Sequence, residues 1–197
     1  MLYKSPWLCY DTVKVIFMHI WKMKKWITVL DYDKRSYRSG LRLKFDKGID
    51  PELKEECKRF AAWLRNEYIF PVRVPIYFKN YVKLRCIDGA TASAAFFRPD
   101  SYFDEPYIRI AVGDYRELCE NWGEIEALFA VLRDIAHELT HYFQWINRLE
   151  LTAVGEERQA TNYSRRIVND EYQEVWESEH IEKVEDWYRS HNVNDDR

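Results

Sequence analysis

The sequence lacks a Cys-x-x-Cys pair, a large net charge and any internal repeat. Its four cysteines, Cys9, Cys57, Cys86 and Cys119, are widely spaced, which argues against a zinc ribbon and favours a reduced, cytoplasmic setting. The formal net charge is only −3, so composition gives no reason to expect direct nucleic-acid binding.

A long apolar run is also missing. The most apolar stretch, "VKVIFMHIWKMKKWITVL" from Val13, is interrupted by four lysines and His19. It is shorter in unbroken apolar length than the roughly 20 residues that a membrane-spanning helix needs, and no small-residue cleavage site follows it. We therefore expect no transmembrane segment and a cytoplasmic location.

What the sequence does contain is enough apolar material for a folded domain. It has 197 residues, of which 47% are hydrophobic and 16% aromatic, and this excludes a disordered chain. The first fifty residues carry eleven Lys and Arg against five Asp and no Glu. We interpret residues 1–50 as a basic, aromatic N-terminal extension and residues 51–197 as the domain, with the boundary at the turn-like "DKGIDPE". The extension is expected to pack on the domain, or to bind an acidic partner or a membrane surface.

Periodicity predicts a domain of the α+β class. Helical spacing of apolar residues covers 53–68, and alternating patterns predict strands at 72–78, 90–97 and 107–112. Pro75 suggests that the first of these strands is interrupted or lies near an edge. The segment "RPDSYFDEP" between the last two strands is typical of a hairpin loop.

A long amphipathic helix is predicted from Asn121 to Ile146. Asn121 is the expected N-cap, with Glu124 at the spacing of a capping box. A second helical region follows Gly155, with a break expected near Asn169 and Asp170, and continues toward Trp187.

The long helix contains the stretch "RDIAHELTHYFQW", in which His137 and His141 flank Glu138. At 100° per residue the two histidines fall opposite the apolar stripe of the helix, which disfavours two buried core histidines. Two exposed surface histidines remain the alternative, but this polar face lacks the usual lysines and glutamates. Histidines four residues apart can reach one ion at about 2.0–2.1 Å, and the adjacent Glu138 suits the general base of a metal-assisted hydrolysis. The motif therefore predicts a catalytic Zn²⁺ site.

A catalytic zinc site needs a third protein ligand. The candidates downstream are Glu156, Glu157, His180 and His191. Glu157 is favoured over Glu156 because Ala160, Thr161 and Ser164 follow it on one helix face, and small side chains allow close helix approach.

Two segments together resemble a known family. "AHELTHYFQ" followed by "EERQATNYSRRIV" is similar to the zinc metallopeptidases of the ImmA/IrrE type, in which the glutamate ligand lies in a Glu-x-x-Ala-x-x-aromatic-small helix. Glu157, Ala160, Tyr163 and Ser164 match that pattern. The resemblance covers residues 53–170 and implies a zincin-like minimal metallopeptidase. Its small mixed or antiparallel sheet would pack on the His-Glu-x-x-His helix, and a glutamate-bearing helix would follow.

The expected activity is zinc-dependent hydrolysis of peptide bonds in a cytoplasmic protein or peptide substrate. The resemblance implies a transcriptional repressor as the substrate. The small-residue segment Ala90 to Ala95 is the candidate edge along which the substrate would add as a strand, and the alternative is that it is simply a tightly packed strand. The alternative is a non-enzymatic protein-binding module that retains a structural zinc site, for which Glu138 would have no purpose.

Two further roles are assigned less sharply by the sequence. The donor that stabilises the developing oxyanion could be Tyr163, His180, Arg165 or Tyr142, with Tyr163 taken as the catalytic candidate beside Glu138. Asp134, one turn before His137, could orient a zinc ligand, or could be an ordinary surface aspartate.

Overall fold

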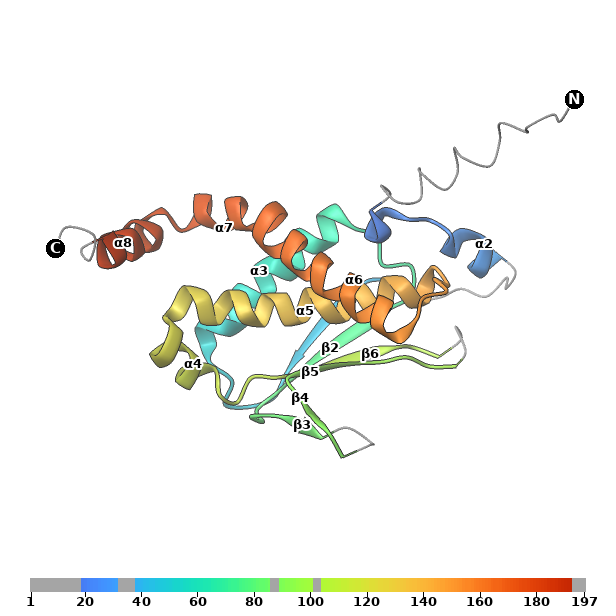
Figure 1. Ribbon diagram of the computed structural model, residues 1–197, viewed down its shortest axis with the longest axis horizontal. Helices are drawn as coiled ribbons and strands as arrows, with labels where there is room; N and C mark the ends of the chain where they lie inside the picture. The colour runs from blue at the N-terminus through green and yellow to red at the C-terminus, as the bar shows by residue number, and fades with distance from the viewer. Residues whose placement is uncertain (1–18, 32–37, 86–88, 101–103, 193–197) are drawn as a thin grey trace, which may run out of the picture.

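The computed structural model describes residues 19–31, 38–85, 89–100 and 104–192. Residues 1–18, with Cys9, and residues 32–37 of the basic segment lie outside the described residues, as do Cys86 and the tip of the loop expected after residue 97. Figure 1 shows the arrangement of the elements. In chain order they are η1 (Ile20–Lys22), α2 (Trp26–Asp31), β1 (Leu41–Phe45), α3 (Pro51–Glu67), β2 (Val74–Lys79), β3 (Leu84–Arg85), β4 (Thr91–Ala92), β5 (Ala94–Phe97), β6 (Tyr107–Ala111), α4 (Tyr115–Trp122), α5 (Glu124–Ile146), α6 (Ala153–Arg165), the π-helix η2 (Arg166–Tyr172), α7 (Gln173–Glu179) and α8 (Ile181–Asn192).

The main sheet is small and mixed, which confirms the α+β class. Its strand order is β1-β2-β6-β5, with parallel pairing in the first two pairs and antiparallel pairing between β5 and β6. Helices α3 and α5 lie on one face of the sheet (Figure 1). Ile76, Ile108 and Ile110 point to this face and are fully buried, whereas Arg109 on the other face is exposed.

Strand β2 is central, so the expectation that Pro75 marks an edge or an interruption is wrong. Pro75 is the second residue of β2 and pairs with Arg42 of β1. The ladder with β6 begins only at Ile76. The missing N–H of Pro75 therefore falls where the neighbouring strand has not yet started, and no ladder hydrogen bond is lost.

The predicted strand 90–97 is two strands separated by Ser93. Thr91–Ala92 pairs with β3 in a separate two-stranded sheet, and Ala94–Phe97 pairs with β6. The carbonyl of Ser93 still accepts a hydrogen bond from the Ala111 N–H at 2.7 Å. Ser93 is thus the point at which the chain passes from one sheet to the other.

The long helix starts later than predicted, and Asn121 is not its N-cap. Asn121 belongs to α4, and the chain breaks at Gly123, whose φ of +87° is readily adopted only by glycine. No side chain caps α5; Glu124 and Glu126 in its first turn instead place negative charge near the positive end of the helix dipole.

The C-terminal helical region is less interrupted near Asn169 than expected. The helix begins at Ala153, where Thr152 Oγ1 accepts a hydrogen bond from the Gly155 N–H at 3.1 Å. Around Asn169 and Asp170 the chain widens into the π-helix η2 instead of breaking, and the actual break is at His180.

The described part of the first fifty residues packs on the domain. Strand β1 forms one edge of the main sheet. Residues 19–26, which we name the N-terminal strap, contact both α5 and α6. Trp21 Nε1 donates to Thr140 Oγ1 at 3.0 Å, and Ile20 N–H donates to the Tyr163 hydroxyl at 3.0 Å. The sheet and core therefore begin before the boundary expected at residue 50.

None of the helices among the described residues combines the length and the apolar character required to cross a membrane.

Candidate metal centre

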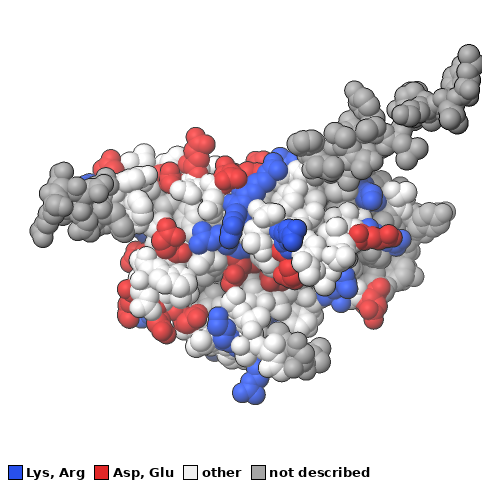
Figure 2. Space-filling view, viewed as in Figure 1, with Lys and Arg blue, Asp and Glu red and all other residues white. Residues whose placement is uncertain are grey.

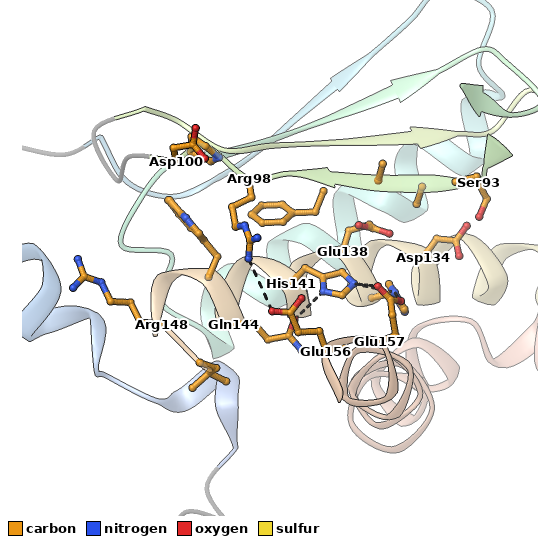
Figure 3. A pocket seen from close by; sticks show the side chains of 18 of the residues that line it. Ser93, Arg98, Asp100, Asp134, Glu138, His141, Gln144, Arg148, Glu156 and Glu157 are labelled. Atoms are coloured by element: carbon orange, nitrogen blue, oxygen red, sulfur yellow. Dashed lines mark hydrogen bonds and ion pairs between the residues drawn. The ribbon is translucent and has the colours of Figure 1, made fainter. Parts of the chain in front are cut away.

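A cleft of about 990 Å³ lies between strand β5 and helices α5 and α6. Figure 3 shows the side chains that line it. The polar and charged residues among them are Ser93, Arg98, Asp100, Asp134, His137, Glu138, His141, Gln144, Arg148, Glu150, Glu156 and Glu157. The volume is at the upper end of the range for ligand sites and is sufficient for a short extended peptide.

Helix α5 presents its two motif histidines to this cleft. Leu132, Ala136 and Leu139 are fully buried on the opposite face, and their burial, about 1.5–3 kcal/mol for each leucine, fixes the rotation of the helix. His137 and His141 are half-buried, with Nε2 atoms 3.2 Å apart. The helical period alone thus places both rings on one side.

Helix α6 brings the carboxylate of Glu157 to the same point. Glu157 Oε2 lies 3.3 Å from His137 Nε2, and Oε1 lies 3.4 Å from His141 Nε2. The buried small residues Ala160 and Ser164 allow α6 to approach α5 closely. The carboxylate of the neighbouring Glu156 instead pairs with Arg98, with Oε1 4.0 Å from Arg98 Nη1 (Figure 3).

The geometry of the three side chains fits a tetrahedral metal. Zinc bonds of about 2.0–2.1 Å at tetrahedral angles require ligand atoms about 3.3–3.4 Å apart. The two Nε2 atoms here are 3.2 Å apart, and the Glu157 carboxylate places one oxygen 3.3 Å from His137 Nε2 and the other 3.4 Å from His141 Nε2. His137, His141 and Glu157 are also the group among the described residues whose ligand atoms converge tightly enough to share one ion. Two imidazoles and a carboxylate match the donor set of a catalytic zinc site.

Glu138 lies on the floor of the cleft and is almost fully buried. Burial raises its pKa to about 8, and the carboxylates of Asp134 and Glu157 act in the same direction. The N–H of Phe96 in β5 donates a hydrogen bond to this carboxylate. A buried carboxyl with a raised pKa beside the candidate ligands can both accept and release a proton.

Strand β5 is the edge strand of the main sheet as the described residues form it, and its outer side borders the cleft. Because the Ser93 carbonyl pairs with Ala111 and the ladder is antiparallel, every second residue points its main-chain groups toward β6. Ala94 and Phe96 therefore point theirs the other way, which agrees with the hydrogen bond from Phe96 to Glu138. The predicted edge segment Ala90 to Ala95 borders the cleft only from Ala92 onward.

The four oxyanion candidates do not line the cleft. The hydroxyl of Tyr163 accepts from Ile20 N–H, and that of Tyr142 donates to the Val72 carbonyl at 2.7 Å. His180 Nδ1 donates to the Trp176 carbonyl at 2.8 Å, and Arg165 is exposed on α6. Tyr163, predicted as catalytic, is thus a structural contact of the strap. Among the described cleft residues, the cations are Arg98 and Arg148.

The remaining predicted position is Asp134, and one residue was missed. Burial raises the pKa of Asp134, and Ser93 donates a hydrogen bond to it, so its described partner is the residue between β4 and β5 and not a histidine. The missed residue is Gln144, whose Oε1 lies 2.8 Å from His141 Nδ1. Its position three residues after His141, on the same helix face, was the available signal.

Comparisons with protein-family models, curated protein sequences and solved structures found no match to this chain. The resemblance to the ImmA/IrrE metallopeptidases therefore rests on the residue pattern alone.

Proposed function

We propose that the protein is a zinc-dependent endopeptidase of the ImmA/IrrE type that acts on a cytoplasmic protein. The observation that carries this proposal is the convergence of His137, His141 and Glu157: the two Nε2 atoms lie 3.2 Å apart, and the two carboxylate oxygens of Glu157 lie 3.3 and 3.4 Å from them. Glu138 distinguishes this site from a structural zinc site, because a structural site has no need of a buried, protonatable carboxyl beside it.

The outer edge of β5 supports a peptide as the substrate. A peptide in extended conformation would add to this edge through the main-chain groups of Ala94 and the carbonyl of Phe96, a mode of binding that tolerates many side chains. Ala94 and Ala95 are only partly buried, and their small side chains leave space for a second backbone.

The chain's own residues account for the proton transfers. Zinc at this site would supply the Lewis acidity that makes water a nucleophile near neutral pH. Glu138 accepts a proton from the attacking water on its carboxylate oxygen and transfers it to the leaving amine nitrogen as the C–N bond breaks. The hydrogen bond from Phe96 N–H holds that carboxylate at the edge where the scissile bond would lie.

The proposal is tested by metal analysis combined with cleavage mapping in cell extract. Glu138→Gln should retain zinc but generate none of the new protein termini that the native chain generates. The matched control is Glu120→Gln, the same chemical change at an exposed residue of α4, which should cleave as the native chain does. Full cleavage by Glu138→Gln would refute the peptidase. Zinc binding without cleavage by the native chain would favour the binding-module alternative.

A further inference from the structure

The cleft contains a buried amide that contacts both ligand-bearing helices. Gln144 of α5 is 3% exposed. Its Oε1 lies 2.8 Å from His141 Nδ1, and its Nε2 donates to the Glu156 carbonyl and to Gln159 Oε1, each at 3.0 Å. A single side chain therefore joins one candidate ligand to the main chain beside another, Glu157.

The orientation of the Gln144 amide follows from its hydrogen bond with the Glu156 carbonyl. The carbonyl of Glu156 is a backbone oxygen and only accepts hydrogen bonds. Nε2 of Gln144 must face it, because the opposite orientation would place two oxygens 3.0 Å apart. Oε1 is then the atom that faces His141.

The orientation of the amide in turn fixes the tautomer of His141. An amide oxygen only accepts, so His141 Nδ1 carries the proton and donates it to Gln144. Nε2 is left with its lone pair directed at His137 Nε2 and Glu157, 3.2 and 3.4 Å away. This is the ring state that a metal ligand requires.

We propose that Gln144 is the positioning residue of the metal centre. It holds His141 in the coordinating tautomer and ties the Glu156 carbonyl of α6, next to Glu157, to α5. This inference rests on the proposed zinc site and goes beyond it, since it assigns zinc affinity and geometry to a residue outside the three candidate ligands.

The test begins with the tautomer in the native, metal-free protein at pH 8. The ring ¹⁵N chemical shifts of His141, assigned by their absence in His141→Gln, should report a protonated Nδ1 and an unprotonated Nε2. The opposite tautomer would overturn the inference. This measurement needs no Gln144 variant to fold.

Variants then separate the two links that Gln144 makes. Gln144→Met, close to glutamine in size, loses both links and should weaken zinc binding about 10- to 100-fold in a chelator competition. It should also alter the visible absorption bands of the Co²⁺-substituted protein, which report ligand geometry. Gln144→Glu keeps an acceptor for His141 but puts an oxygen against the Glu156 carbonyl, and should recover part of the lost affinity.

Gln159→Met is the matched control, because it removes only the outer acceptor and leaves the link to His141 intact. Its zinc affinity should stay within about threefold of the native value, well short of the loss typical of a residue that holds a ligand directly. Native affinity and an unchanged Co²⁺ spectrum in Gln144→Met would overturn the positioning role while leaving the proposed peptidase standing. Failure of the native chain to bind zinc would overturn both.

Discussion

Replacing Trp21 by alanine should destabilise the fold by about 3–5 kcal/mol, the cost of truncating a buried aromatic side chain. Trp21 is 2% exposed. Its ring stacks on Phe143 with centroids 4.8 Å apart and meets Tyr68 edge-on at 5.0 Å. Each such aromatic pair contributes about 0.5–1.5 kcal/mol beyond its buried area.

The indole N–H adds a separable part of this cost. Its hydrogen bond to Thr140 is buried, and Thr140 Oγ1 still donates to the Ala136 carbonyl at 2.8 Å when the indole is removed. Trp21→Phe should therefore lose only about 1 kcal/mol. The difference between the two variants measures the ring itself.

The assay is urea unfolding followed by circular dichroism, with a chelator present so that metal binding does not add to stability. The midpoint should fall while the slope m stays constant. Trp122→Ala is the matched control, because Trp122 on α4 is 57% exposed and its loss should change stability by less than about 0.5 kcal/mol. A loss below about 1 kcal/mol in Trp21→Ala would refute the packing of the strap on α5.

Three further predictions concern the cleft and the strap. Glu157→Ala should lose zinc, whereas Glu156→Ala should retain it, because the Glu156 carboxylate faces Arg98; equal zinc content by atomic emission would refute the assignment of the third ligand. Arg98→Ala should change the free energy of unfolding by less than about 0.5 kcal/mol, because the Arg98 side chain is 61% exposed and its ion pair with Glu156 is long, at 4.0 Å. A urea titration that shows a larger loss would contradict this. Burial lowers the pKa of His19 from 6.5 to about 4, with Arg166 and Lys22 lowering it and Glu171 raising it. The unfolded chain therefore binds more protons as the pH falls from 6.5 toward 4, and stability drops over that window, by about 2 kcal/mol between pH 7 and pH 5. His19→Phe should lose correspondingly less between these two pH values in the same titration, and an equal loss would exclude His19 as the cause.

The features that sequence predicted well depend on local periodicity. The facing of His137 and His141 away from Leu132 and Leu139 follows from the helical repeat within three turns of α5. The approach of Glu157 follows from the small side chains on one face of α6. Neither conclusion needs knowledge of residues distant along the chain.

What sequence did not predict depends on distant contacts or on competing local signals. The Tyr163 hydroxyl bonds Ile20, 143 positions away, and no periodicity reveals that pairing. The role of Gln144 requires the position of the Glu156 carbonyl on another helix. At the start of α5, the capping-box spacing of Asn121 competed with the conformational freedom of Gly123, and the glycine decided where the helix broke.

The N-terminal strap also sets an order of events during synthesis. Trp21 leaves the ribosome 119 residues before its partner Thr140, and Ile20 leaves 143 residues before Tyr163. At about 5–20 residues per second, the interval is on the order of ten seconds. For that time the Trp21 indole N–H and the Ile20 main-chain N–H lack these two partners, and the strap can bind the junction of α5 and α6 only after α6 has been synthesised.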